Sequence, residues 1–426
     1  MCYAIPGKIV EIKERLAVID YFGEKRNVLK DFSDVKIGDY VYAQGGIIIS
    51  KLNEIEAKEI LKFWKDKFFQ LKKIDSQFTK IADQKNVSGN LLAVFQKVNL
   101  KQPLNKADLL SILNIKKQQE LNLLFQMANN LRQKELDNAC CVHGIIEFSN
   151  YCQNDCWYCG IRKSSKIDRY RLSPEEIIKV AKTAVNKFGF KALVLQSGED
   201  YWYDEDKLIK LIKLIKELEV LIFLSIGVRL KETYQKLYQA GARAVLLRFE
   251  TSNEKTFHRL RPKTTLAERL NLIKDLKKQG YLMATGFLIG LPSETKQDII
   301  NNVLLTKSLN PEMYSFGPFI PAPGTPLAKN KIVDKSEVLK IIALTRLMDR
   351  QAKILVTTAL ETFGPTVKKE GLLAGANSLM INVTPKIYKD KYTIYPNRPD
   401  LAIATNIKET INLLYSIGRA PTDLGI

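Results

Sequence analysis

The sequence predicts an α/β protein in which a small N-terminal β-barrel domain precedes a parallel (β/α)8 barrel of the TIM type. Three observations support this fold. From about Val142 onward, eight short β-branched runs alternate with stretches of helical period. The first 55 residues or so are short strands divided by turn signals. Three cysteines follow the first strand of the larger unit, where barrels of this type carry functional residues.

The small β-barrel domain is expected at residues 1–73. Its last part, residues 53–73, has the period of an amphipathic helix. Residues 74–102 show weak periodicity and are expected to be a linker. The strand candidates of the domain are "GKIVEI", "LAVIDYFG", "KRNVLK" and "DYVYAQGGIIISKL".

The large barrel is expected at residues 103–426, with capping helices before its first strand. The helix after that strand has a clear start, because Ser173 can cap it, Pro174 follows and Glu176 completes a capping box. Further helices are expected to begin near Asp204, Leu230, Leu266, Glu294, Lys335, Val367 and Ile407. The strand candidates are "VHGIIEFS", "KALVLQS", "VLIFLSIG", "AVLLRFE", "LMATGFLIG", "MYSFGPF", "KILVTTAL" and "SLMINV".

The composition excludes several classes of protein. Hydrophobic residues make up 46% of the 426, which is ample for a packed core, and no apolar run approaches the roughly 20 residues of a membrane-spanning helix. The formal net charge is +20, but no nucleic-acid-binding fold accompanies it, so we expect neither a membrane nor a nucleic acid as partner. The absence of a signal pattern and the clustered cysteines predict a cytoplasmic protein with metal or redox chemistry.

The segment "SNYCQNDCWYCGIRK" places Cys152, Cys156 and Cys159 within eight residues. Structural zinc takes four ligands, and the next candidates, Cys140 and Cys141, lie at the opposite end of the first barrel strand. A cubane iron–sulfur cluster needs one outside ligand on each iron, so three cysteines leave one iron open for a substrate or cofactor. The C-x3-C-x2-C spacing therefore favours a [4Fe-4S] cluster over zinc.

The cysteine loop, with Tyr158 before its last cysteine, resembles the signature of the radical S-adenosylmethionine (SAM) superfamily. The resemblance implies a radical SAM barrel whose cluster is bound by the three cysteines. It implies that the amino and carboxylate groups of SAM chelate the open iron, and that Tyr158 contributes to cofactor binding. Reduction of the cluster would then cleave SAM to a 5′-deoxyadenosyl radical.

Further motifs end other strands of the predicted barrel. "QSGED" ends the second strand and resembles the motif that receives the SAM amine, which implicates Ser197, Gly198 and Glu199. Its carboxylate and carbonyl oxygens can accept hydrogen bonds from an ammonium group. "GFLIGLPSET", with Gly290, resembles the motif on the adenine and ribose side, although a tight turn alone would also explain this glycine.

Three further groups of polar side chains, five residues in all, each have two open interpretations. In "LLRFETS", Arg248 and Glu250 share one face of the fourth strand, where they either form a structural ion pair or contact SAM and a substrate. Arg269 can clamp the SAM carboxylate or be a solvated charge on its helix. Thr357 and Thr358 offer two hydroxyl groups at a strand end, which β-propensity also explains.

The barrel as a whole resembles HydE, the radical SAM maturase of [FeFe]-hydrogenase, more than it resembles biotin synthase or methylornithine synthase. The motifs that carry the resemblance include "IIEFSNYCQNDCWYCGIRK", "LVLQSGED", "LLRFETSN", "HRLRP" and "FGPFIPAPGTPLA". The resemblance implies a substrate carboxylate held by Arg248, Thr357 and Thr358, and SAM surrounded by Ser197, Glu250 and Arg269.

The chain departs from the HydE pattern at two strand ends. Val228 stands where HydE commonly has a glutamate, and Phe249 stands where it has a histidine. Both changes are expected to make the pocket less polar. No cysteine follows Cys159, so no second cluster is expected.

The N-terminal domain resembles HypC, the chaperone of [NiFe]-hydrogenase maturation, through "MCYAIPGKIVEI" and "IGDYVYAQGGIIISKLNEIEA". In that family the residue matching Cys2, freed by loss of Met1, helps carry an iron with cyanide and carbonyl ligands. The resemblance implies a metal-ligand role for Cys2, whose thiol suits a soft metal. Gln44 stands where HypC proteins normally have a histidine, which removes one candidate ligand.

Together the resemblances imply a radical SAM enzyme that helps to build the diatomic-ligated iron of a hydrogenase. The partners implied are an iron–cysteine–carbonyl–cyanide synthon or an amino acid as substrate, a reductant such as ferredoxin or flavodoxin, and other maturation proteins. Two alternatives stay open: an amino-acid-processing enzyme of the methylornithine synthase or biotin synthase type, and a non-catalytic iron carrier. A tRNA-modifying role would fit the charge but lacks an RNA-binding module.

Overall fold

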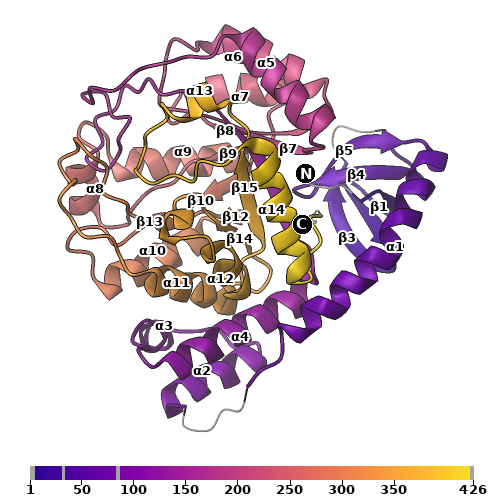
Figure 1. Cartoon of the computed structure of the whole chain (residues 1–426), viewed down its shortest axis with the longest axis horizontal. Coiled ribbons are helices and arrows are strands. Elements are labelled where there is room, and N and C mark those ends of the chain that lie inside the picture. The colour runs from indigo at the N-terminus through magenta and orange to yellow at the C-terminus, as the bar shows by residue number, and fades with distance from the viewer. Residues whose placement is uncertain (1–4, 31–33, 83–86, 423–426) are drawn as a thin grey trace.

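Two closed barrels form the centre of the computed structural model, which describes residues 5–30, 34–82 and 87–422. In Figure 1 the small barrel (indigo) stands beside the large barrel, whose helices form an outer ring. The small barrel has the strand order β1-β2-β3-β5-β4, and the large barrel has the order β10-β12-β14-β15-β6-β7-β8-β9. All neighbouring strands of the large barrel pair in parallel. The predicted fold class is confirmed.

The small barrel is completed by the helix that follows it, as the sequence predicted. The side chain of Asn53 accepts a hydrogen bond from the Ile55 N–H at 2.8 Å and so caps this helix. Trp64, Phe68 and Leu71 of the helix pack into the core of the small barrel. The elements are β1 (Gly7–Lys13), β2 (Leu16–Tyr21), β3 (Glu24–Leu29), β4 (Tyr40–Gln44), β5 (Ile47–Leu52) and α1 (Glu54–Gln77).

The segment 74–102 is more structured than the linker that the sequence predicted. Helix α1 continues to Gln77, and α2 (Gly89–Asn99) packs against α3 (Lys106–Leu113). The buried side chains of α2 are Leu91, Val94, Phe95 and Val98. So short a helix owes its stability to tertiary packing, which the weak local periodicity did not reveal. Helix α4 (Gln118–Leu136) then leads into the large barrel.

Strands and helices of the large barrel follow the predicted order. The capping box of Ser173 and Glu176 is present. The fifth and sixth predicted strands are each split, and their second halves, β11 and β13, pair in a separate two-stranded sheet. The strands are β6 (Cys141–Ser149), β7 (Ala192–Ser197), β8 (Leu221–Ser225), β9 (Ala244–Leu246), β10 (Leu282–Thr285), β11 (Leu288–Ile289), β12 (Met313–Tyr314), β13 (Gly317–Pro318), β14 (Lys353–Val356) and β15 (Ser378–Asn382).

The helices of the large barrel alternate with its strands. Two short helical turns, of the π and 3₁₀ types, lie among them as η1 (Thr183–Lys187) and η2 (Leu360–Phe363). The α-helices are α5 (Pro174–Lys182), α6 (Glu205–Lys216), α7 (Lys231–Ala240), α8 (Glu254–Leu260), α9 (Leu266–Lys278), α10 (Lys296–Ser308), α11 (Lys335–Met348), α12 (Val367–Leu373), α13 (Lys386–Lys389) and α14 (Ile403–Ser416).

The turn between β4 and β5 closes the N-terminal end of the large barrel. Gly45 in this turn has φ +65°, and a Cβ there would come 2.8 Å from Cδ2 of Leu221 and 3.6 Å from Cδ1 of Leu282. Those leucines are the first residues of β8 and β10. Ile47 packs with the side chains that fill the barrel interior, such as Phe223. The small barrel therefore forms a floor, and the functional face is the opposite end.

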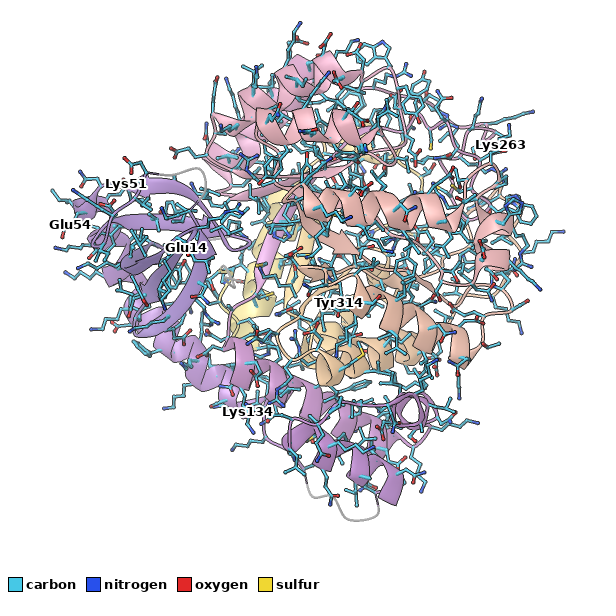
Figure 2. The ribbon with its side chains drawn as sticks, turned by 180° about the vertical axis from the view of Figure 1, so that it is seen from behind. Glu14, Lys51, Glu54, Lys134, Lys263 and Tyr314 are labelled. Carbon is cyan, nitrogen blue, oxygen red and sulfur yellow. The ribbon has the colours of Figure 1, made fainter. Side chains whose placement is uncertain are left out.

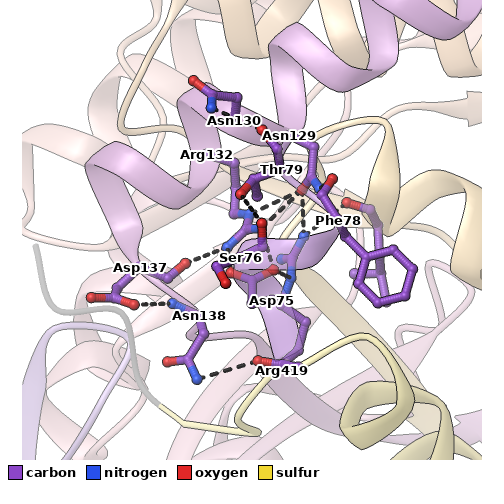
Figure 3. A network of polar contacts seen from close by, with 12 residues as sticks. Asp75, Ser76, Phe78, Thr79, Asn129, Asn130, Arg132, Asp137, Asn138 and Arg419 are labelled. Carbon is purple, nitrogen blue, oxygen red and sulfur yellow. Dashed lines mark hydrogen bonds and ion pairs between the residues drawn. The ribbon is translucent and has the colours of Figure 1, made fainter. Parts of the chain in front are cut away.

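A buried ionic network joins α1, α4 and the C-terminal segment (Figure 3). Asp75 accepts hydrogen bonds from Arg132 and Arg419, and both arginines also donate to Oδ1 of Asn129. The chain passes so close here that a Cβ on Gly418 would come 2.1 Å from the Asp75 nitrogen. The network holds the helix of the N-terminal domain against the large barrel.

Charged side chains cover the outside of both barrels (Figure 2). Lys51 and Glu54 on the small barrel, Lys134 below it and Lys263 on the far side of the large barrel are all exposed. The buried side of α6 consists of leucine and isoleucine, and its lysines face outward. Much of the +20 charge is thus spread over solvated helix faces. Within the described ranges, no helix combines the length and apolarity needed to cross a membrane.

Candidate active site

A cavity of about 260 Å³ lies at the C-terminal ends of the large barrel's strands. Nearly all of the residues that the sequence singled out line it, although they come from separate strand ends and loops. These are Cys152, Cys156, Tyr158, Cys159, Ser197, Gly198, Glu199, Arg248, Glu250, Arg269, Thr357 and Thr358. Two predicted site residues are not in this set: Gly290 is not part of the lining, and Cys2 lies outside the described residues.

Gly290 forms a tight turn. It has φ +85°, its N–H donates to Oε2 of Glu294 at 2.7 Å, and a Cβ there would come 2.4 Å from Cβ of Val333. The positive φ and the close approach of Val333 are enough to require glycine at this position, without any contact to a ligand.

The cysteine loop is held by backbone contacts from distant segments. The Trp157 N–H donates to the Leu260 carbonyl at 2.9 Å, and the Gly160 N–H donates to the Ile394 carbonyl at 3.0 Å. A Cβ on Gly160 would come 1.9 Å from the Thr393 oxygen, so this close approach requires glycine. The loop is therefore held in place by the protein as well as by any metal that it binds.

The three cysteines have the chemistry of cluster ligands. Burial raises the pKa of the Cys152 and Cys159 thiols, and the charge of neighbouring Cys156 raises it further. Thiolates in this place therefore need a bound cation to stabilise them. Among the described residues no three His, Cys, Asp or Glu side chains converge on a single metal ion. A cluster, by contrast, offers a separate iron to each thiolate, so the residues fit a cluster.

Glu199 is a buried carboxylate that faces two guanidinium groups. Its Oε1 lies 3.3 Å from NH2 of Arg261 and 3.9 Å from NH1 of Arg269. Gly227 makes room for it, because a Cβ there would come 1.9 Å from Cγ of Glu199. Arg269 is only 7% exposed, so its interpretation as a solvated charge is wrong. This cluster of charges can receive the ammonium and carboxylate ends of an amino acid group.

Arg248 and Glu250 are close but only loosely paired. NH2 of Arg248 lies 3.3 Å from Oε2 of Glu250, yet that oxygen has no hydrogen-bond partner among the described residues. Glu250 also has φ +68°, a strained conformation that costs about 1–3 kcal/mol in a residue other than glycine. Oγ1 of Thr357 is another buried oxygen without a described partner. Such orphaned oxygens in one cavity suit a polar ligand.

Two further residues complete the site, and sequence reasoning assigned them no role. Arg261, from the "HRLRP" segment, donates to the Tyr158 hydroxyl at 2.9 Å as well as facing Glu199. Burial alone would lower its pKa, but its negative and phenolic neighbours hold the pKa well above its usual value. The Tyr395 hydroxyl lies 2.8 Å from Oγ1 of Thr358. Tyr395 lies in an irregular segment, so no periodicity could have revealed it.

The two departures at Val228 and Phe249 do not make the cavity less polar, contrary to expectation, because neither residue lines it. Phe249 is fully buried in the surrounding core, with its ring centroid 6.1 Å from that of Phe287. Its neighbours Arg248 and Glu250 both line the cavity, whereas Phe249 packs in the hydrophobic core.

Three family profiles match the chain. The Radical SAM superfamily matches residues 146–305, the HupF/HypC family matches residues 1–64, and the Biotin and Thiamin Synthesis associated domain matches residues 315–418. Together these matches cover both barrels.

Characterised relatives match the large barrel. The chain is 40% identical to the [FeFe] hydrogenase maturase subunit HydE of Thermotoga maritima over 304 residues, which covers 70% of this chain and 86% of that protein. It is 32% identical to 3-methylornithine synthase of Methanosarcina acetivorans over 321 residues, covering 75% and 90%.

Solved structures show the same fold. The crystal structure of methylornithine synthase superposes with a TM-score of 0.68 at 27% identity, covering 77% of this chain and 97% of that one. The hydrogenase maturase HydG of Carboxydothermus hydrogenoformans superposes with a TM-score of 0.65 at 21% identity, covering 83% and 84%.

Proposed function

The chain belongs to the HydE family of radical SAM enzymes, which use a [4Fe-4S] cluster and SAM, and we propose that it acts on a small carboxylate-bearing substrate during hydrogenase maturation. When bound, the cluster and SAM supply one-electron cleavage of a carbon–sulfur bond and radical chemistry on a nearby substrate. The observation that carries the proposal is the single cavity of about 260 Å³ that the three cysteines share with Arg248, Thr357 and Thr358.

We infer that one side of the cavity holds the cofactors. Cys152, Cys156 and Cys159 would ligate the cluster. The carboxylates of Glu199 and Glu250 would accept hydrogen bonds from the SAM amine and ribose, with Ser197, Gly198, Tyr158 and Arg269 around them. The burial of Glu199 between Arg261 and Arg269 supports this assignment, because it holds the carboxylate in place.

The other side of the cavity would hold the substrate. Arg248 offers a guanidinium group, and the Thr357 hydroxyl has no partner among the described residues, so both can bind a carboxylate. Tyr395 would position Thr358 through their hydrogen bond. An iron–cysteine–carbonyl–cyanide synthon or an amino acid has the carboxylate that this set requires. The reductant would be a small electron carrier such as ferredoxin or flavodoxin.

The N-terminal domain, residues 1–73, would serve the same reaction by holding iron. Its match to the HupF/HypC family supports this role, and the fusion would raise the local concentration of iron at the large barrel. Cys2 would be one iron ligand. If Cys2→Ala left iron loading and maturation unchanged, this part of the proposal would be withdrawn.

The test is anaerobic reconstitution of the cluster, followed by reduction with SAM and assay of 5′-deoxyadenosine. The assay would be run without any added compound, with free cysteine, and with an iron–cysteine–carbonyl–cyanide complex. We expect the complex to stimulate formation of 5′-deoxyadenosine. Cys156→Ala should abolish the activity, and Cys140→Ser, a buried cysteine outside the cavity, should retain it.

Other outcomes would decide between the alternatives. A rearranged amino acid product, with no effect of the iron complex, would favour an enzyme of the methylornithine synthase type. SAM binding without any cleavage would favour a non-catalytic iron carrier.

A further inference from the structure

A second cavity, of about 10 Å³, lies at the floor of the large barrel. It is lined by Gly45 of the small barrel and by Cys141, His143, Glu312 and Lys353 of the large barrel, among others. A cavity of this size holds about one water molecule or one ion. It shares no residue with the cavity of about 260 Å³ at the C-terminal ends of the strands, which is the mouth of the barrel.

Polar atoms without partners gather at this floor cavity. Neither ring nitrogen of His143 has a hydrogen-bond partner among the described residues, although the side chain is only 1% exposed. Oε1 of Gln44 also lacks a described partner; this fully buried residue is not in the cavity lining but precedes Gly45, which is. Because buried polar groups in native proteins nearly always have a partner, these atoms point to a bound species.

Gln44 and Cys141 bring the two domains into contact at this place. Nε2 of Gln44, at the end of β4, donates to Sγ of Cys141, the first residue of β6, at 3.9 Å. His143 and Ile145 follow at alternate positions, and Ile145 packs in the barrel interior. Since side chains alternate along a strand, Cys141 and His143 share the inward face with Ile145.

We propose that Cys141, His143 and Gln44 bind one divalent transition-metal ion, such as Zn²⁺ or Fe²⁺, at the floor of the large barrel. Thiolate, imidazole and amide oxygen are suitable donors for such ions. No third His, Cys, Asp or Glu converges with Cys141 and His143 among the described residues. Gln44, whose side chain contacts Sγ of Cys141 at 3.9 Å, would supply its amide oxygen as the third protein ligand, and a fourth position would stay open.

The protons of this site are accounted for, and the ion with the Cys141 thiolate leaves one net positive charge, which an anion at the open position would neutralise. Glu312 and Lys353 contribute one formal charge of each sign at the cavity wall. Metal binding displaces the thiol proton of Cys141, which passes to solvent. His143 keeps one ring proton and coordinates through its other nitrogen. Gln44 turns its amide so that Oε1 faces the ion in place of Nε2.

The ligands come from both domains, so the ion would fasten the small barrel to the floor of the large barrel. Gln44 belongs to the small barrel, whereas Cys141 and His143 belong to the first strand of the large one. Neither domain alone holds the full set.

The test uses zinc, because the cluster at the mouth contains iron. The full chain with its reconstituted cluster is incubated with one equivalent of ZnCl₂, desalted, and examined by zinc analysis and by X-ray absorption at the zinc K edge. We expect about one zinc per chain, with one sulfur among nitrogen and oxygen ligands. His143→Leu and Cys141→Ala should each reduce the retained zinc by about tenfold or more. Cys140→Ala, at the neighbouring buried position, should retain it.

Several results would overturn the proposal. These are zinc that is not retained, zinc that is retained equally by His143→Leu, and zinc that is lost in Cys2→Ala but kept in Cys141→Ala. Circular dichroism checks that each variant folds. If the large-barrel variants do not fold, Gln44→Leu tests the same site from the other domain, and unchanged zinc there would also overturn it.

Discussion

Both carboxylate oxygens of Asp75 accept hydrogen bonds from the guanidinium group of Arg132, each at 2.7 Å, and neither side chain is exposed to solvent. Arg419 donates to the same carboxylate from the far end of the chain at 3.2 Å. Burial and the neighbouring Arg132 lower the pKa of Arg419 to about 10. One carboxylate thus pairs with two buried cations, and through them it connects the helix of the small barrel to the large barrel.

Asp75→Asn is expected to lower the free energy of unfolding by about 3–5 kcal/mol, because it leaves two buried guanidinium groups without their counter-charge. Urea unfolding followed by circular dichroism measures this change. Asp66→Asn, at an exposed position of the same helix, is the control and should change stability by less than about 0.5 kcal/mol. A loss below about 1 kcal/mol for Asp75→Asn would mean that other groups neutralise the arginines.

Gly227→Ala is expected to weaken SAM binding, because the new methyl group would displace the Glu199 carboxylate. A hydrogen bond to a charged group contributes ~1.5–3 kcal/mol, so the dissociation constant should rise about tenfold or more. Isothermal titration of the cluster-loaded chain with SAM measures it, and the iron content should not change. Gly324→Ala is the matched control, since φ is +73° there against +75° and no atom lies within 4 Å. Equal effects of both variants would assign the loss to backbone strain alone.

Thr357→Val is expected to raise the KM of the substrate about tenfold without destabilising the fold. Its hydroxyl oxygen has no partner among the described residues. Removing it should therefore not lower the free energy of unfolding and can raise it by up to about 1 kcal/mol. Formation of 5′-deoxyadenosine, measured against the concentration of the stimulating compound, gives the KM. Thr345→Val is matched, because that hydroxyl is also buried without a described partner but lies outside the cavity. A similar KM increase in Thr345→Val would contradict a role in substrate binding.

Glu294 should make the stability of the protein depend on pH. Burial raises its pKa from the ordinary 4.5 to about 7, although the Gly290 N–H donates to its carboxylate. Between these values the native state holds a proton that the unfolded chain has lost. The protonated carboxyl therefore makes its full contribution to the free energy of unfolding below pH 4.5. This contribution is lost as the pH rises through 7.

Glu294→Gln is expected to remove this dependence. Relative to the variant, the wild type should lose on the order of 3 kcal/mol in free energy of unfolding between about pH 4.5 and 8. Urea unfolding at a series of pH values measures the difference. The exposed Glu232→Gln should follow the wild-type curve. Parallel curves for the wild type and Glu294→Gln would rule out this carboxyl as the source.

Much of the cavity at the strand ends could be predicted because the barrel topology by itself brings its residues together. Parallel strands in a closed barrel end on the same face, so Cys152, Glu199, Glu250 and Thr358 had to meet once each was recognised at a strand end. The cysteine spacing predicted a cluster for a different reason, since all three proposed ligands lie in one loop. Gly290 shows the limit of this rule, because it ends a strand that turns away into a separate two-stranded sheet.

Residues whose roles depend on distant contacts could not be predicted in this way. Arg261 is the first residue after α8, and only the folded chain brings it between Tyr158 and Glu199. Asp75 and Arg419 are 344 positions apart and pair because α1 and the C-terminal segment pack together. His143 reads in the sequence as one residue of an apolar strand.

Periodicity and capping residues therefore predicted the two barrels, and the cysteine spacing predicted a cluster loop, because each of these patterns lies along the chain. The packing of the small barrel onto the floor of the large one was decided by contacts between separate domains. It brings Gln44 to Cys141 and buries Asp75 among arginines, and no local pattern encodes such long-range proximity.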